Sequence, residues 1–219
     1  MSDDPQPTGS DGLPLVDGSD LDPEGGPRAD ATVAGVLLAG GLSSRFEGGN
    51  KLLADVGGRP VVYNAAATLA EGIDDVTVVL GHEAEAVREA LSGLDVTFVV
   101  NDAYEAGQAT SVRAGVEAAP EADALVLALG DMPFVLPRSV RMLVDAYRAS
   151  EGTALAAAYK GQRGNPALFD ATHRDALTGA EGDTGGRGLL LSEGVLVETG
   201  DPGVRTDIDS RGDLEAFEP

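Results

Sequence analysis

The chain has 219 residues, of which 37 are Asp or Glu and 15 are Lys or Arg, so its formal charge is −22. Nucleic acids and anionic membranes would be repelled by such a charge, and we expect neither as a partner. There is no cysteine, which excludes disulfides and thiolate metal sites. No apolar stretch reaches membrane-spanning length and no signal peptide is visible, so we expect a cytoplasmic protein.

Residues 1–31 are rich in Asp, Pro, Gly and Ser and have few large apolar side chains. Such a segment cannot bury enough apolar surface to offset the entropy that it would lose on ordering. We therefore predict a disordered acidic tail over residues 1–31. The acidic, lysine-poor composition of the whole chain resembles that of halophilic proteins, in which salt screens the self-repulsion.

From Thr32 onward, short apolar runs, several of them rich in β-branched residues, alternate with segments of helical pattern. The predicted strands are Val33–Ala39, Val76–Leu80, Val96–Val100, Ala124–Leu129, Ala154–Tyr159 and Pro166–Phe169. The predicted helices are Val61–Leu69, Glu83–Leu91, Ser111–Ala118, Pro137–Arg148 and Asp213–Phe217. This alternation predicts one α/β domain over residues 32–219, with a mostly parallel sheet covered by helices on both faces.

The most informative segment is residues 36–60, VLLAGGLSSRFEGGNKLLADVGGRP. A buried strand opens there into a loop of small residues, whose backbone N–H groups can approach phosphates, and the loop carries Arg45 and Lys51. It is neither a P-loop, because Leu52 follows Lys51, nor a dinucleotide fingerprint, because G-x-G-x-x-G is absent. A glycine-rich surface turn with incidental cations is the alternative. We favour a triphosphate-binding loop, since one of the only two lysines stands in it.

Asp131 is the strongest metal-ligand candidate. It follows the apolar run Ala124–Leu129 and a glycine, which places it at the carboxyl edge of the predicted sheet. We expect the glycine loop to face it across a space the size of a triphosphate. Asp209 could hold the metal or, as an alternative to Ser210, cap the last helix. Thr110 and Ser111 could contact a nucleoside or cap a helix.

Five segments, taken in chain order, resemble the nucleotidyltransferases that include the molybdenum-cofactor cytidylyl- and guanylyltransferases. They are Leu38–Lys51 with Gly58 and Pro60, Asn101–Gly115, Gly130–Pro133, Arg163–Pro166 and Asp207–Asp209. The resemblance implies a three-layer, Rossmann-like nucleotidyltransferase domain that uses Mg²⁺. It further implies transfer of CMP from CTP to the phosphate of molybdopterin, with release of pyrophosphate, in molybdenum-cofactor biosynthesis.

The same resemblance implies a role for each segment. Arg45, Lys51 and Asp131 would be catalytic, and Asp131 and Asp209 would hold Mg²⁺ between carboxylates and phosphate oxygens. The nucleoside would be held by two loops, at Leu38, Ala39, Gly40, Gly41, Ser43, Gly107, Thr110 and Ser111. The acceptor would lie beside Arg163, Gly164, Asn165 and Pro166.

The motifs leave more than one interpretation of the base and of the activity. Ala39-Gly40-Gly41 resembles the guanylyl branch, whereas the middle and C-terminal motifs favour cytidine, so a GTP-dependent guanylyltransferase is the nearest alternative. Arg45 and Lys51 are also one residue further apart than the family pattern has them, which leaves the phosphate contact of Lys51 open. A sugar-phosphate nucleotidyltransferase and a non-catalytic nucleotide-binding module are more distant interpretations of the same motifs. A molybdoenzyme or a chaperone is the expected protein partner.

Overall fold

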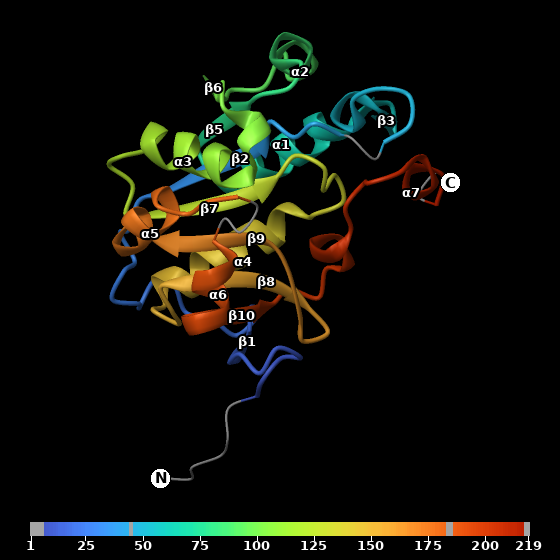
Figure 1. The fold of residues 1–219 in the computed structure, drawn as a ribbon. Helices are drawn as coiled ribbons and strands as arrows, with labels where there is room; N and C mark the ends of the chain where they lie inside the picture. Colours follow the sequence, from blue (N-terminus) through green and yellow to red (C-terminus); the bar gives the residue numbers. More distant parts are fainter. Residues whose placement is uncertain (1–6, 44–45, 183–185, 217–219) are drawn as a thin grey trace, which may run out of the picture.

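The computed structural model describes residues 7–43, 46–182 and 186–216 of the chain. Its central feature is an eight-stranded sheet in the order β1-β10-β8-β9-β7-β2-β5-β6, which Figure 1 shows from its lower to its upper edge. The strands are β1 (Leu15–Asp17), β2 (Val33–Ala39), β5 (Asp75–Leu80), β6 (Thr97–Val100), β7 (Ala124–Leu129), β8 (Ala154–Tyr159), β9 (Gln162–Asp170) and β10 (Val195–Glu198). Only β9 runs antiparallel to its neighbours, so the predicted mostly parallel sheet is confirmed.

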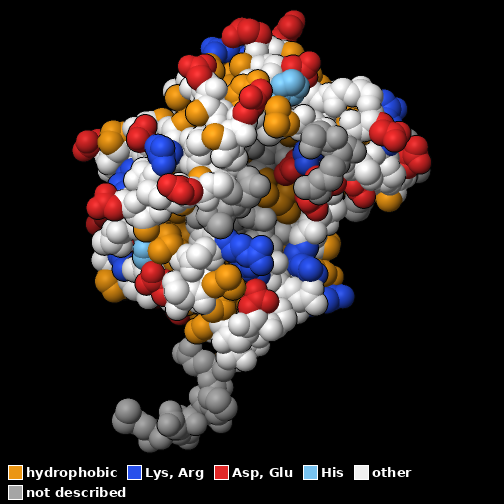
Figure 2. Space-filling model, in the orientation of Figure 1, with side chains coloured by type: hydrophobic (Ala, Val, Ile, Leu, Met, Phe, Trp, Pro, Cys, Tyr) orange, Lys and Arg blue, Asp and Glu red, His pale blue; other side chains and the backbone are white. Residues whose placement is uncertain are grey.

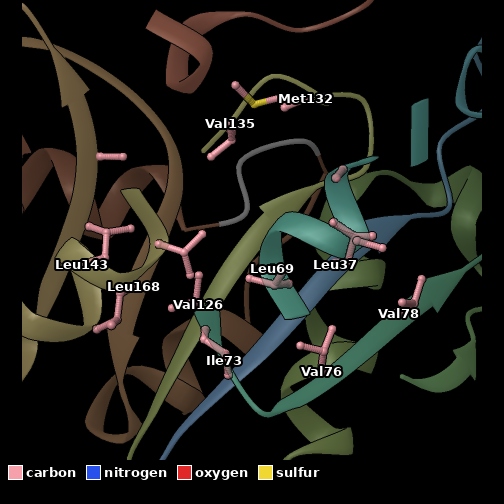
Figure 3. Packing of buried hydrophobic residues seen from close by; sticks show 14 of the residues in the cluster. Leu37, Leu69, Ile73, Val76, Val78, Val126, Met132, Val135, Leu143 and Leu168 are labelled. Atoms are coloured by element: carbon pink, nitrogen blue, oxygen red, sulfur yellow. The ribbon is translucent and has the colours of Figure 1, made fainter. Parts of the chain in front are cut away.

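Helices cover both faces of this sheet, which makes three layers. One face carries α1 (Val61–Gly72), α2 (Ala84–Ala90) and α4 (Pro137–Arg148), and the other carries α3 (Gln108–Ala118), α5 (Arg174–Thr178) and α6 (Arg187–Glu193). Side chains of β2 alternate between the two layers, because successive residues of a strand point to opposite faces. Leu37 packs in the first cluster, part of which Figure 3 shows, and Val36 packs in the second.

The helix α4 shows why the sequence pattern was readable. It begins at Pro137, where a missing backbone N–H has no cost. Its buried residues include Val140, Leu143, Val144 and Tyr147, which share one side of a helix with 3.6 residues per turn. Within the described part of the chain, no helix is long and apolar enough to cross a membrane.

Predicted and observed elements agree best where the pattern is strong, since β2, β7, β8 and α4 have the predicted bounds. The helix α3 begins at Gln108 with Gly107 as its N-cap, so neither Thr110 nor Ser111 caps it. The last helix has Ser210, and not Asp209, as its N-cap. This last helix, α7, spans Arg211–Glu215. The sequence did not reveal the strands β1 and β10, the helices α5 and α6, or the hairpin of β3 (Asp55–Val56) and β4 (Arg59–Pro60). It also did not reveal four short 3-10 helices: η1 (Lys51–Leu53), η2 (Tyr104–Ala106), η3 (Ala171–His173) and η4 (Pro202–Arg205).

The N-terminal segment corrects the prediction of a disordered tail over residues 1–31. Leu15–Asp17 form β1, which pairs in parallel with Leu196–Glu198 of β10, and Leu13 is buried against the sheet. A few apolar residues are enough here, because the edge of β10 supplies backbone partners that composition does not reveal. Residues 1–6 lie outside the described residues.

Candidate active site

The candidate site lies at the carboxyl ends of the central strands. The chain leaves β2 toward β5 and β6 and returns on the other side of β2 as β7, so the strand order reverses there. Open α/β sheets bind ligands at such a switch point. Backbone hydrogen bonds bring the three strand ends together: the N–H of His82 donates to the carbonyl of Gly40, at 3.3 Å, and that of Gly130 donates to Leu38, at 3.0 Å.

A cavity of about 500 Å³ opens at this edge. Most of the predicted nucleotide and catalytic residues line it, namely Leu38, Gly40, Gly41, Ser43, Lys51, Gly107, Ser111 and Asp131. Ala39 instead packs into the core beneath the cavity, and Thr110 is not among the lining residues. Arg45 lies outside the described residues. Residues that sequence reasoning did not single out also line the cavity, among them Leu42, Tyr104, Glu105, Gln108 and Gly182.

The glycine loop forms one wall of this cavity. A Cβ on Gly41 would meet no atom within 4 Å, so packing does not demand glycine there, and the bare backbone is open to a ligand. The loop is held by its own polar groups: the Ser43 hydroxyl donates to Oδ1 of Asn50, at 3.1 Å, and accepts from the N–H of Lys51, at 3.3 Å. Asn50 Oδ1 also accepts from the N–H of Leu52 and so caps η1. These contacts fix the start of the segment that carries Lys51.

The loop between β6 and α3 forms the opposite wall. Gly107, with φ of +108°, adopts a backbone conformation that favours glycine at the N-terminus of α3. The buried amide of Asn101 holds this wall, since its Nδ2 donates to the hydroxyl oxygens of Thr110 and Ser111, at 2.9 and 3.0 Å. The Thr110 hydroxyl in turn donates to backbone carbonyls, so its role is to shape the loop. Arg113 hydrogen-bonds the carbonyl of Thr178.

Lys51 lies between two carboxylates at the mouth of the cavity. Its Nζ is 2.6 Å from Oδ2 of Asp131 and 2.7 Å from Oδ1 of Asp209, and the Lys51 side chain is only 14% exposed. The structure thus puts Lys51 and Asp131 on the same side of the molecule, in direct contact. Asp131 and Asp209 are also close together, as a shared cation requires.

Charge and burial act against each other in this cluster. Burial by itself would lower the pKa of Lys51, but the charges and hydrogen bonds of Asp131 and Asp209 outweigh it, so the pKa is raised. Burial raises the pKa of Asp207, and repulsion by Asp131 and Asp209 raises it further. Asp131, Asp207 and Asp209 therefore lie around Lys51, which is the one cation that the described residues contribute to this cluster. The cluster has an excess of negative charge, and this excess favours the binding of a further cation.

The carboxylates fit a hard divalent metal ion. Oδ1 of Asp131 is buried and has no hydrogen-bond partner within the described ranges, which leaves one oxygen available as a ligand. Those ranges contain no cluster of three or more acidic or histidine side chains with metal-binding geometry. Asp131 and Asp209 could thus supply two ligands to a divalent ion, and phosphate oxygens and water could supply the others. A Mycobacterium tuberculosis protein solved as a complex with manganese has 28% identity to the chain, with a TM-score of 0.70 over 85% of this chain and 97% of that one.

A buried aspartate that sequence reasoning missed joins the two loops that carry these carboxylates. Asp201, 1% exposed, accepts hydrogen bonds from the N–H of Leu136, the hydroxyl of Ser139 and the N–H of Gly203, at 2.9, 2.7 and 2.8 Å. The N–H of Ile208 also donates to the carbonyl of Asp131, at 2.9 Å. Asp-Pro-Gly at residues 201–203 signals a turn in the sequence, but not its burial against the loop after β7.

Replacement of Asp201 by Ala is expected to lower the free energy of unfolding by about 3–5 kcal/mol, because three donors, two of them in the buried residues Ser139 and Gly203, lose a charged acceptor. Urea unfolding followed by circular dichroism measures this loss. Asp201→Asn keeps one acceptor oxygen and should lose less. A loss below about 1 kcal/mol in Asp201→Ala would mean that the loops are joined without this carboxylate.

A second cavity, of about 320 Å³, adjoins the first and shares Leu38, Gln108 and Leu129 with it. Its floor is apolar and includes Val112, Leu127, Phe169 and Leu190, and its polar lining includes Arg163, Asn165 and Arg187. Figure 2 shows Lys and Arg side chains gathered over the β9 and α6 region of this face. Of the predicted acceptor residues, Arg163, Gly164 and Asn165 line the cavity, whereas Pro166 contacts a small void on the other side of the sheet.

Together, the switch-point cavity, its glycine loop and its Lys–carboxylate cluster define a nucleotidyltransferase. A family model described as the MobA-like NTP transferase domain matches residues 35–196. The chain therefore belongs to the MobA-like NTP transferase family. Two curated relatives and a further solved structure give the range of proteins to which it is similar.

Nicotine blue oxidoreductase of Paenarthrobacter nicotinovorans is 34% identical over 175 residues, which cover 76% of this chain and 85% of that protein. A probable molybdenum cofactor guanylyltransferase of Haloferax mediterranei is 36% identical over 107 residues, or 48% of this chain and 50% of that protein. A nucleotidyl transferase from Methanothermobacter has a TM-score of 0.73 and 28% identity, with coverage of 85% of this chain and 95% of that one. The predicted family and fold are confirmed.

Proposed function

We propose that the chain transfers CMP from CTP to the phosphate of molybdopterin, in a reaction that depends on Mg²⁺ and releases pyrophosphate. The observation that carries this proposal is the pair of adjoining cavities. The first combines a glycine loop with Lys51 and Asp131, and the second combines an apolar floor with Arg163 and Arg187. The first cavity is chemically complementary to a triphosphate, and the second is complementary to a flat acceptor that carries an anionic group.

In the proposed reaction, an oxygen of the acceptor phosphate attacks the α-phosphorus of CTP. A new P–O–P bond forms, the bond from the α-phosphorus to the bridging oxygen breaks, and that oxygen leaves with pyrophosphate. Backbone from Ala39 to Ser43 and the loop Gly107–Ser111 would hold the nucleoside. Arg45 and Lys51 would bind the triphosphate and stabilise the leaving pyrophosphate. Mg²⁺, held by Asp131 and Asp209, would neutralise phosphate charge.

The test is a thermal-shift panel of the four triphosphates with and without Mg²⁺, in high salt. We expect CTP with Mg²⁺ to raise Tm most, because a ligand that binds only the folded state stabilises it. Pyrophosphate release from CTP and molybdopterin then measures turnover. A larger shift with GTP, and turnover with GTP alone, would replace this proposal by the guanylyltransferase activity named for the Haloferax relative. The absence of pyrophosphate release with every triphosphate would contradict both.

Oxidoreduction is a second candidate, favoured by one observation: the match to nicotine blue oxidoreductase covers 85% of that protein. An oxidoreductase needs an electron donor, so NADH and NADPH belong in the same ligand panel. A Tm shift with a reduced nicotinamide dinucleotide, and none with any triphosphate, would favour this candidate over nucleotidyl transfer.

A further inference from the structure

An N-terminal arm, residues 7–17, lies beside the second cavity although it precedes the region that the family model matches. The N–H of Ser10 donates to the carbonyl of Gly161 in the β8–β9 turn, at 2.8 Å, and the N–H of Leu196 donates to Pro14, also at 2.8 Å. Leu13 is buried against the sheet. The arm is therefore docked on the sheet by both backbone hydrogen bonds and apolar packing.

The docked arm brings Asp11 to Arg163. The Nε of Arg163 donates to Oδ2 of Asp11 at 3.2 Å, and the two side chains are 20% and 32% exposed, in that order. The hydroxyl of Ser10 donates to the other oxygen of Asp11, at 3.3 Å. Gly12, with φ of +76°, allows the tight turn that follows Asp11.

This contact uses one edge of the Arg163 guanidinium. The two Nη groups of Arg163 make no hydrogen bond within the part of the chain that the structure describes. Arg163 also lines the second cavity, together with Arg187. A guanidinium presents its Nη groups as a planar fork that binds two oxygens of a phosphate at once. The free edge of Arg163 therefore suits a phosphate in this cavity.

We propose that Asp11 is a positioning residue of the acceptor site, which holds Arg163 so that its Nη edge binds the phosphate of the acceptor. This inference rests on the proposed function for the identity of that phosphate. Asp11 also brings a negative charge, which would weaken anion binding. This repulsion is weak, because the Asp11–Arg163 pair is partly exposed and is screened by salt. An Arg163 side chain that Asp11 did not hold would lose more rotamer entropy on binding the phosphate, so we expect the positioning effect to be the larger of the two.

The test compares Asp11→Ala and Asp11→Asn with wild type in the pyrophosphate assay. Asp11→Ala should raise the KM for molybdopterin about threefold to tenfold and leave kcat and the KM for CTP unchanged. Asp11→Asn should be close to wild type, since its amide oxygen can still accept from Nε. The exposed Asp20 offers a matched control, and Asp20→Ala should change nothing. In an Arg163→Ala background, Asp11→Ala should have no further effect.

Labelling with phenylglyoxal gives a readout that needs no turnover. Arg163 should be modified faster in Asp11→Ala than in wild type, with Arg113 unchanged as an internal control, and inorganic phosphate should protect Arg163 less well in the variant. Equal labelling and equal protection in the two proteins would overturn the inference, and so would a lower KM for molybdopterin in Asp11→Ala. A wild-type chain that releases no pyrophosphate contradicts the proposed function, and the phosphate protection then decides the inference by itself.

Discussion

Replacement of Asp131 by Asn is expected to lower kcat by about three orders of magnitude and to leave the fold intact. Asp131 has one carboxylate oxygen on Lys51 and a second that is buried and has no partner in the described structure. An amide has nearly the same shape, so packing is kept, but it is a poor ligand for Mg²⁺. A metal ion contributes several kcal/mol of charge stabilisation in the transition state, and each 1.36 kcal/mol corresponds to about a tenfold change in rate.

The measurement is pyrophosphate release at saturating CTP, Mg²⁺ and acceptor, with Tm recorded on the same preparations. Asp102→Asn is the matched control, because Asp102 is an exposed acid near the cavity and is not among its lining residues. It should keep full activity. Turnover of Asp131→Asn at the wild-type rate would show that the carboxylate at this turn neither holds the metal nor acts on the phosphates.

The sequence predicted the centre of the fold because two simple rules operate there. Short apolar runs such as Val33–Ala39, followed by glycine and alternating with helical patterns, favour buried strands, and the carboxyl ends of parallel strands meet at one edge of a sheet. Those rules are enough to bring the glycine loop, the loop before α3 and Asp131 together. The structure places Gly40, Ser111 and Asp131 around one cavity, as the sequence led us to expect.

The features that the sequence did not reveal depend on partners far away in the chain. The strand β1 is ordered by the edge of β10, which composition cannot show. Asp201 resembles an ordinary turn residue until Ser139 and Leu136 are seen to donate to it. The position of Lys51 was open because the loop is one residue longer than the family pattern. The contact with Asp209, from the other end of the chain, could not be derived from spacing.

Replacement of Lys51 by Met is expected to weaken the binding of CTP with Mg²⁺ about tenfold to a hundredfold, because a hydrogen bond to a charged group contributes about 1.5–3 kcal/mol and each 1.4 kcal/mol corresponds to about a tenfold change in Kd. Met keeps the apolar stem but removes the ammonium from between Asp131 and Asp209, so these carboxylates repel each other and the phosphates. Isothermal titration calorimetry measures the affinity. Lys160→Met is the matched control, because the other lysine of the chain lies over the ring of Tyr159, outside the cavity. Equal affinity in Lys51→Met and wild type would exclude Lys51 as a phosphate ligand.

The same variant should reveal the ion pairs through the pH dependence of stability. Because the pKa of Lys51 is raised in the folded state, its ion pairs contribute stability that is fully present below the unfolded pKa of about 10.4 and is lost as the pH rises through the folded pKa. The difference in the free energy of unfolding between wild type and Lys51→Met should thus be constant from about pH 7 to about pH 10 and should shrink at higher pH. Urea unfolding over this range measures it. A difference that already shrinks between about pH 7 and about pH 9 would require a lowered pKa, and would mean that burial of Lys51 outweighs its two carboxylate partners.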